Sequence, residues 1–233
     1  MISGPRNIST AMLYSFDNRP DCTGVDEPFY GDYLTRFPEI NHPGRMDILK
    51  SMQTQHQQVI DDIYSQVDKS TLLFIKNMSH HIADADLKWM QDHKVFMLIR
   101  DPARVIRSFT KVIANPTPTD IGIIQQWNIY QTLTEMGLNV PVVNTDKFLQ
   151  SPETQMPLLC QAIDIPYHSA MLQWKPGARA VDGIWAPHWY QSVHQSSGFK
   201  KTTYTKPPAV EARYLPIYDA VLPSYQELER RSL

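Results

Sequence analysis

The chain has little cysteine, little net charge and no long apolar run, and each absence excludes a class of protein. Only two of the 233 residues are cysteine, too few for a disulfide framework or a cysteine-based metal cluster. The formal net charge is −2, so no protein-wide positive field attracts nucleic acid or an acidic membrane. The longest apolar runs, such as Val95–Ile99, have strand length and cannot span a bilayer. We therefore expect a reduced, cytoplasmic, globular protein without a signal peptide.

The ATP-type loop pattern G-x-x-x-x-G-K-[ST] is also missing, which weighs against an ATPase or GTPase. Another N-terminal loop, Gly4–Thr10, still has the composition of an anion site. It lies before a predicted helix over Ser9–Phe16, whose positive end and backbone N–H groups suit phosphate or sulfate. Arg6 adds a planar, charged donor. The alternative is a plain strand–turn–helix junction with Ser9 as the helix cap.

A second arginine lies at a predicted strand end. Arg100 is followed by Asp101 and Pro102, a capping acid and a proline at the first helical position. Ser108 comes eight residues after Arg100, about two turns along that helix. A second anion would fit between the guanidinium and the hydroxyl. The alternative is an ordinary surface ion pair and a solvated serine.

Strands and helices alternate along the chain and predict an α/β fold. The loop at Gly4 leaves room for a strand of only three residues, so either that strand is short or residues have been lost from the start. Later strands are expected at 23–26, 72–75, 95–99 and 140–143. Helices are expected at 46–67, 102–113, 120–136 and 152–163. This alternation favours one phosphate-loop domain over residues 1–233, with a doubly wound, mainly parallel sheet of about five strands.

The last sixty residues follow a different pattern. Residues 174–208 are rich in tryptophan, tyrosine, histidine, serine and proline, and we expect a long, ordered loop region there. Residues 209–231 are expected to be helical, with breaks at Pro216 and Pro223.

The two arginine segments together resemble the sulfotransferase superfamily. Pro5–Thr10 looks like its phosphosulfate loop P-[KR]-S-G-T-T, and Arg100 with Ser108 has the spacing of its 3′-phosphate site. Tyrosylprotein sulfotransferases resemble this chain in two further ways. They carry arginine in the loop, as at Arg6, and a catalytic glutamate after the second strand, at the place that Glu27 has here. A branch of sulfotransferase-like proteins in bacteria and plants, some with aminotransferase-like names, is similar over about residues 3–199, in the segments G-P-R-N-I-S-T, V-D-E-P-F-Y, K-N-M-S-H-H, I-R-D-P and W-A-P-H-W-Y-Q-S-V-H-Q-S-S-G-F.

The resemblance implies 3′-phosphoadenosine 5′-phosphosulfate (PAPS) as cosubstrate. It assigns the 3′-phosphate to Arg100 and Ser108. It assigns the 5′-phosphosulfate to the loop residues Gly4, Pro5, Arg6, Asn7, Ile8, Ser9 and Thr10. Ile8 replaces the loop glycine of the better-known enzymes and cannot easily take a positive φ. We therefore expect a loop of different shape, with more effect on catalysis than on anion binding.

Glu27 is the expected general base for an acceptor hydroxyl or amine. It precedes Pro28, which favours an extended conformation at a strand end. Asp26 is the rival base, because strand alternation would turn only one of the two carboxylates toward the site. The alternative for Glu27 is a surface carboxylate or an ion-pair partner of Arg6.

Three further side chains are candidates for the transfer step. Lys76 is expected to stabilise the bridging oxygen, and His80 or His81 is an alternative base. The two histidines can equally be structural. Adjacent histidines are a poor metal chelate without further ligands, so we predict no metal.

The late loop supplies candidates for the acceptor and the nucleotide. Trp185, His188, Trp189 and Tyr190 would line the acceptor pocket, or they simply anchor the loop. Ser196, Ser197 and Lys200 would close over the nucleotide, as residues after this region do in the resembled family.

Two other functions remain open. A nucleotide or small-molecule kinase would need Mg²⁺ and an acidic ligand, for which Asp101 is available. A protein of this fold that binds the nucleotide without catalysis is the other alternative. For each reading we expect a small-molecule or peptide partner, no nucleic acid and no membrane, while the acceptor and the oligomeric state stay open.

Overall fold

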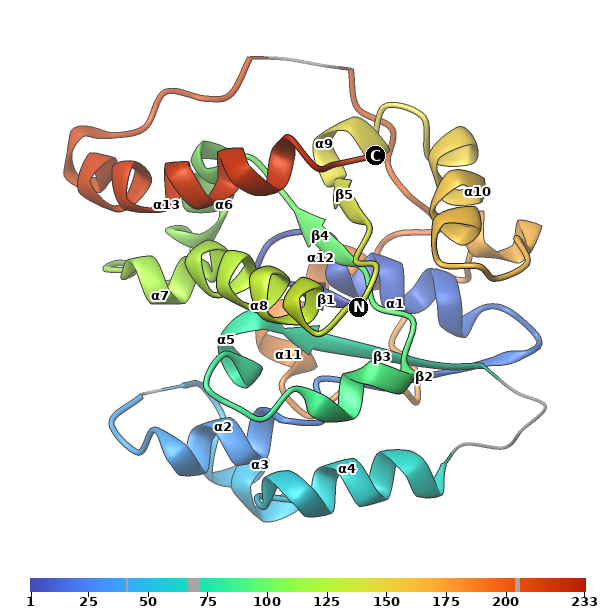
Figure 1. Ribbon diagram of the computed structural model, residues 1–233. Coiled ribbons are helices and arrows are strands. Elements are labelled where there is room, and N and C mark those ends of the chain that lie inside the picture. Colours follow the sequence, from blue (N-terminus) through green and yellow to red (C-terminus); the bar gives the residue numbers. More distant parts are fainter. Residues whose placement is uncertain (41, 67–71, 204–205) are drawn as a thin grey trace. The chain divides into compact units, whose positions relative to one another are not determined.

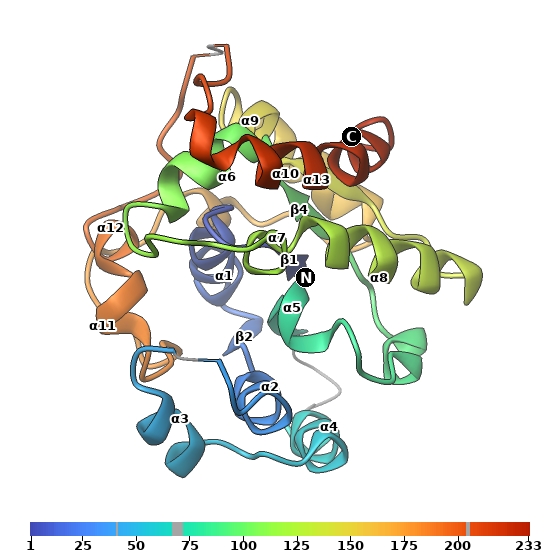
Figure 2. The ribbon, with the colours of Figure 1, turned by 90° about the vertical axis from the view of Figure 1, so that its left-hand side faces the viewer.

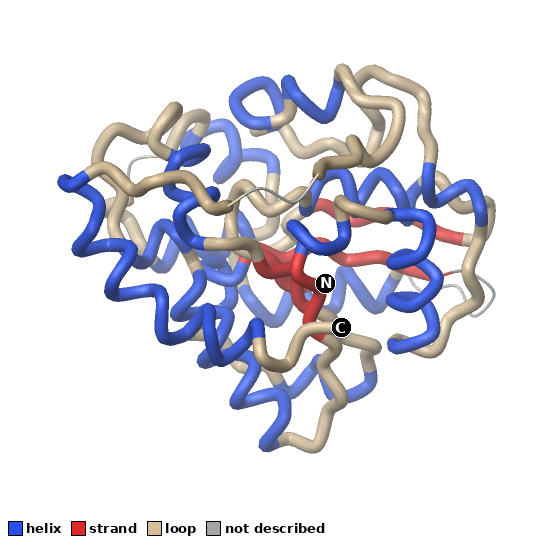
Figure 3. Tube along the Cα trace, turned by 90° about the horizontal axis from the view of Figure 1, so that it is seen from above, coloured by secondary structure: helices blue, strands red, loops and turns tan. Residues whose placement is uncertain are grey.

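The computed structural model describes residues 1–40, 42–66, 72–203 and 206–233 (Figure 1). Its strands belong to a five-stranded sheet in the order β2-β3-β1-β4-β5. They are β1 (Ile2–Ser3), β2 (Cys22–Asp26), β3 (Leu72–Met78), β4 (Met97–Ile99) and β5 (Val142–Asn144). Figure 3 distinguishes the strands from the helices and loops. The predicted α/β class is confirmed, and the N-terminal strand is as short as the sequence allowed.

Helices follow every strand. They are α1 (Ser9–Asp17), α2 (Tyr30–Arg36), α3 (Arg45–Ser51), α4 (His56–Ser65), α5 (Ser79–Ile82), α6 (Pro102–Phe109), α7 (Pro118–Ile121), α8 (Ile123–Glu135), α9 (Thr145–Phe148), α10 (Pro152–Ala162), α11 (Ala186–Trp189), α12 (Gln191–His194) and α13 (Leu215–Glu229), with 3₁₀ turns η1 (Lys88–Asp92), η2 (Ser169–Leu172) and η3 (Ala212–Tyr214). Within the described residues, no helix has both the length and the apolar character needed to cross a bilayer.

The chain divides into two compact units. The first unit comprises Met1–Ser9, Met78–Tyr167 and Lys200–Leu233, and the second comprises Thr10–Asn77 and His168–Phe199. The single domain expected over residues 1–233 stays a prediction.

The first unit is built on β1, β4 and β5. Ile2 pairs with Met97, and Met97 with Val142, in parallel register. All three strands are fully buried, which explains their continuous apolar sequence. Helix α13 packs along α8 and α6 (Figure 2). Asp101 caps α6 by accepting hydrogen bonds from the backbone N–H groups of Ala103 and Arg104, as predicted.

The second unit is built on β2 and β3, which run parallel with Asp26 opposite Lys76. Their carboxyl ends therefore meet at one edge, where parallel α/β sheets place functional residues. Beside the strands, residues of α2 and α3 pack with residues 174–199, which we call the late segment. Together they form an aromatic cluster that consists of Tyr30, Tyr33, Leu34, Ile48, Trp185, Ala186 and Tyr190.

The prediction of one continuous helix over residues 46–67 is wrong. The structure has α3 and α4 instead, separated at Met52–Gln55, and residue 67 lies outside the described residues. The Gln53 side chain accepts hydrogen bonds from the N–H groups of Thr54 and Gln55 at 3.0 and 3.3 Å. Such local bonds compete with the helical ladder. Residues 120–136 are likewise divided, at Gly122, where φ is +75°.

The predicted break at Pro223 is also wrong, because α13 runs unbroken through it. The helical segment expected from residue 209 becomes α-helical only at Leu215, after the 3₁₀ turn η3. Pro216 lies in the first turn, where no intrahelical N–H bond is needed. Pro223 does remove a bond, at a cost of about 3 kcal/mol in an ordinary helix. Burial of Val221, Tyr225 and Leu228 offsets that loss. The long loop expected over 174–208 contains the short helices α11 and α12, and residues 204–205 lie outside the described residues.

We predict that Gly122→Ala destabilises the protein more than Gly137→Ala. Both glycines have a positive φ, +75° and +87°, so both alanines carry a left-handed cost of about 1–2 kcal/mol. A Cβ on Gly122 would also lie 2.7 Å from the Ser79 hydroxyl oxygen, whereas a Cβ on Gly137 meets nothing within 4 Å. Overpacking adds roughly 1–3 kcal/mol. Equal urea midpoints for the two variants would contradict this account.

Candidate functional site

The loop between β1 and α1 has an unusual backbone. Arg6 and Ile8 both adopt left-handed conformations, with φ of +58° and +52°. The expectation that Ile8 avoids positive φ is therefore wrong, and a β-branched residue there is rare enough to indicate a strongly constrained loop. Within the described residues, the backbone N–H groups of Arg6, Asn7 and Ile8 have no acceptor. Successive N–H groups in such turns form an anion-binding concavity.

The Asn7 side chain fixes that loop to neighbouring parts of the first unit. Its side chain is buried, and its Nδ2 donates to the Leu98 carbonyl at 2.6 Å. Its Oδ1 lies 2.7 Å from the Thr145 hydroxyl, which donates to it. Gly4 lies so close to α7 and α8 that a Cβ would be 2.9 Å from the carbonyl oxygen of Ile121. The loop backbone is therefore fixed to β4 and to the start of α9, and Asn7 is a structural anchor.

Arg6, Arg100 and Ser108 come together in the first unit. Arg6 Nε donates to Ser108 Oγ at 2.9 Å, and Arg100 Nη1 donates to the backbone oxygen of Arg6 at 2.9 Å. The sequence analysis paired Ser108 with Arg100, whereas in the structure the Ser108 hydroxyl accepts a hydrogen bond from Arg6. Burial lowers the pKa of Arg6, and the neighbouring charge of Arg100 lowers it further. Because the charge of Arg100 disfavours the charge of Arg6, an anion that contacts both guanidinium groups would relieve this electrostatic penalty.

Asp146 is a residue of this site that the sequence analysis missed. Its Oδ1 lies 3.3 Å from Arg100 Nε and 3.5 Å from Arg104 Nε. One carboxylate therefore serves two arginines, while Arg6 bonds a neutral hydroxyl. The signal in the sequence was its place two residues past β5, at the strand edge where ligand sites gather. Asp101 is used as the helix cap, which removes the kinase reading's candidate metal ligand from that role.

A second cluster lies at the ends of β2 and β3 in the second unit. Lys76 Nζ donates to Asp26 Oδ1 at 2.7 Å, to Glu27 Oε1 at 2.5 Å and to the Tyr190 hydroxyl oxygen at 2.7 Å. All four residues are buried. An ammonium has three N–H donors, and each of these contacts uses one of them. We call these four residues the carboxylate cluster.

Both carboxylates face Lys76, so the expectation that only one of them would face the site is wrong. The reason is the backbone at Glu27, whose φ is +46°. The extended conformation expected before Pro28 is therefore also wrong. The left-handed turn follows the last residue of β2, so strand alternation no longer applies to Glu27. It turns the Glu27 side chain back to the side of Asp26.

The two carboxylates of the carboxylate cluster share one ammonium, because Lys76 Nζ forms an ion pair with both Asp26 and Glu27. Burial raises the pKa of Glu27, Asp26 adds to that effect, and Lys76 opposes it. Burial also opposes the charge of Lys76, but the two carboxylates outweigh it and raise the lysine pKa well above its ordinary value. A carboxyl group with a raised pKa is suited to act as a general base.

The remaining predicted residues are placed as follows. Trp185 is buried, and its Nε1 donates to the Tyr190 hydroxyl oxygen at 3.1 Å. His188 and Lys200 are exposed. Thr10 is half-buried in α1. Ser196 holds the late segment together, because its Oγ accepts from Trp174 Nε1 and donates to the Val193 carbonyl.

The two histidines lie on α5 in the first unit. His81 is buried and His80 half-buried, with their rings 4.5 Å apart at an angle of 79°. Among the described residues, no group of three or more histidine, cysteine or acidic side chains is placed to hold a metal. The absence of a metal remains an expectation.

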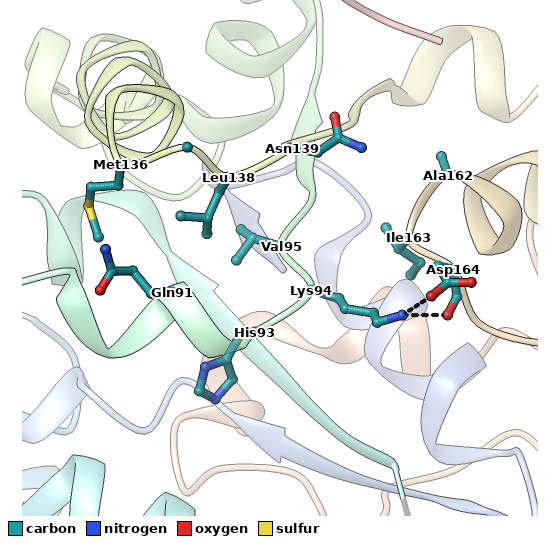
Figure 4. A pocket seen from close by; sticks show the side chains of 11 residues that line it. Gln91, His93, Lys94, Val95, Met136, Leu138, Asn139, Ala162, Ile163 and Asp164 are labelled. Carbon is teal, nitrogen blue, oxygen red and sulfur yellow. Dashed lines mark hydrogen bonds and ion pairs between the residues drawn. The ribbon is translucent and has the colours of Figure 1, made fainter.

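A pocket of about 370 Å³ lies elsewhere in the first unit, at the amino ends of β4 and β5 (Figure 4). Val95 and Leu138 line it, and Lys94 pairs with Asp164 beside it. It contains none of the predicted site residues.

A family model described as a sulfotransferase domain matches residues 1–232. The chain belongs to this sulfotransferase family. It is 34% identical over 224 residues to the branched-chain-amino-acid aminotransferase-like protein 1 of Arabidopsis thaliana and 30% identical over 228 residues to protein 2 of that name. The matches cover 93% and 97% of this chain but 40% of each relative. The chain therefore spans about two fifths of these relatives.

Solved sulfotransferases share the fold of this family member. One is a sulfotransferase from Alicyclobacillus acidocaldarius, with a TM-score of 0.58, 10% identity and coverage of 100% of this chain and 95% of that one. The sulfotransferase domain of the curacin biosynthetic pathway has a TM-score of 0.57 at 13% identity, over 95% of each chain. The corresponding domain of the Synechococcus PCC 7002 olefin synthase has 0.52 at 17%, over 95% and 92%.

We predict that Glu27→Gln changes how stability depends on pH. Burial raises the folded-state pKa of Glu27 above its unfolded value. The folded form therefore holds this proton more tightly, and stability present below the unfolded pKa is lost as pH rises through the folded pKa. Glutamine cannot ionise, so relative to the original chain the variant should gain stability between pH 5 and pH 8. Urea unfolding at both values measures this, with the exposed Glu39→Gln as control. A constant difference would show that Glu27 does not titrate in this range.

Proposed function

We propose that this sulfotransferase-family protein transfers the sulfuryl group of PAPS to a hydroxyl or amine of a small-molecule or peptide acceptor. The observation that carries the proposal is the meeting of Arg6, Arg100 and Ser108 beside a loop with unbonded N–H groups. PAPS is anionic at both ends, and such a donor fits two adjacent arginines that have too few carboxylate partners.

The proposal gives the anion-binding residues two roles. Arg6, the loop N–H groups, Ser9 and Thr10 bind the 5′-phosphosulfate, where charge develops as the bond to sulfur breaks. Arg100 and Ser108 bind the 3′-phosphate. Because Arg6 already touches Ser108 in the structure, the donor would separate these two side chains and take their place as hydrogen-bond partner.

The proposal makes Glu27 the general base. Its carboxylate takes the proton of the acceptor hydroxyl or amine as that atom bonds to sulfur, while the bond between sulfur and the bridging oxygen breaks. The products are the sulfated acceptor and 3′-phosphoadenosine 5′-phosphate, and Glu27 then releases its proton to water. Lys76 was expected at the bridging oxygen. Since its three donors are engaged, we assign it to holding the carboxylates.

The donor claim is tested with the spent nucleotide, 3′-phosphoadenosine 5′-phosphate. At 100 times its dissociation constant it should stabilise the protein by about 2.7 kcal/mol, seen as a rise in Tm. Loss of one charged hydrogen-bond donor weakens binding by about 1.5–3 kcal/mol, so Arg6→Met and Arg100→Met should each bind at least about tenfold more weakly.

Arg107→Met is the matched control, because Arg107 is exposed on the same helix as Ser108. ATP at equal concentration separates this donor from that of a kinase. No Tm shift at millimolar nucleotide, or an equal loss in the Arg107 variant, would remove the donor claim.

Transfer is tested with sulfur-labelled PAPS and a panel of phenols, sugars, amines and peptides. Glu27→Gln should retain the Tm shift with the spent nucleotide and lose turnover by about a hundredfold or more. Normal turnover in this variant would assign the base to another residue. Binding without transfer to any acceptor would favour the non-catalytic alternative.

A further inference from the structure

Tyr190 has every hydrogen-bonding position of its hydroxyl group occupied. Its oxygen accepts from Lys76 Nζ at 2.7 Å and from Trp185 Nε1 at 3.1 Å. A phenol oxygen has two lone pairs, so both are used. Its own proton must then point to a carboxylate, and Asp26 Oδ2 lies 2.6 Å away, whereas Glu27 Oε1 lies at 3.4 Å. The orientation of this proton is therefore set by its surroundings.

Asp26 accepts hydrogen bonds at both of its carboxylate oxygens. Its Oδ1 accepts from Lys76, and its Oδ2 accepts from the Tyr190 hydroxyl and from the backbone N–H of Gly183 at 3.3 Å. Three donors, one of them charged, stabilise a carboxylate as an anion. These three donors occupy both oxygens of Asp26, which disfavours its role as the rival base.

Tyr190 is itself held firmly. Its side chain is buried in the aromatic cluster with Trp185 and Tyr30. The ammonium of Lys76 also lies 5.0 Å from the centre of its ring, within the range of a cation–π interaction. The residue comes from the late segment, between α11 and α12, so this segment completes the surroundings of the two carboxylates.

We propose that Tyr190 is a positioning residue that donates its proton to Asp26 and so leaves Glu27 as the carboxylate that takes the acceptor's proton. This inference rests on the proposed sulfuryl transfer. It replaces the expectation that Tyr190 lines the acceptor pocket.

The direction of the effect follows from the groups that face Glu27. They include Asp26 on β2, Lys76 on β3, Tyr190 on the late segment and Tyr30 on α2. The Tyr190 hydroxyl stabilises the negative charges, and its removal should raise the pKa of Glu27. Asp26 repels that charge, and its neutralisation should lower the pKa of Glu27. A merely structural role for Tyr190 predicts no such opposite shifts.

The test compares Tyr190→Phe with Asp26→Asn. The acid limb of kcat/KM against pH should move up by about half a pH unit or more in Tyr190→Phe, as expected for one lost hydrogen bond. It should move down in Asp26→Asn. Tyr33→Phe removes a phenol from the same aromatic cluster and should leave the limb in place.

Two further measurements make every outcome decisive. The Tm shift with the spent nucleotide is recorded first, because its loss in the original chain overturns the proposed function instead of this inference. The pH dependence of unfolding, with and without Glu27→Gln, reports the same Glu27 titration without turnover. If Tyr190→Phe moves neither profile while nucleotide still binds, or if Tyr33→Phe moves the acid limb as far as Tyr190→Phe does, the role of Tyr190 is refuted.

Discussion

The backbone at the ends of β1 and β2 is the constraint on which the functional residues depend. Arg6, Ile8 and Glu27 hold left-handed conformations with φ between +46° and +58°, each at a cost of about 1–3 kcal/mol. Such conformations persist only where several contacts with the surrounding structure hold the backbone in place. The Asn7 side chain does this for the loop, through bonds to Leu98 and Thr145. Lys76 does it for Glu27, through its ion pair and through the backbone bond that its carbonyl accepts from the Glu27 N–H at 2.9 Å.

Each unit holds like charges close together at such a place. In the first unit the charge of Arg100 acts on Arg6, and in the second Asp26 and Glu27 pair with the same lysine. Like charges in a partly dry environment are destabilising unless an opposite charge joins them. The acidic pair has Lys76 as its permanent counterion. Among the described residues, the basic pair has only a share of Asp146, which is why we assign it to an anionic substrate and the acidic pair to proton transfer.

The comparisons establish family and fold, and the chemistry is argued from the side chains. Sulfotransferase structures at 10–17% identity superpose with TM-scores of 0.52–0.58, which speaks for a shared architecture alone. The aminotransferase-like names belong to plant proteins of which this chain matches 40%. Lys76 is fully engaged with its three neighbours, and the arginines are grouped for an anion. These two arrangements support the assignment to sulfuryl transfer.

The sequence by itself determined the alternation of strands with helical segments, the cap at Asp101 and the place of Arg100 at a strand end, because these depend on local periodicity and on residues within a few positions of each other. Tertiary structure decided the rest. Pro223 lies within an unbroken helix because burial outweighs the lost bond. Ile8 and Glu27 take positive φ because distant side chains hold them there. Tyr190 meets Lys76 across 114 positions of sequence, and a contact between residues so far apart leaves no periodic signal in the chain.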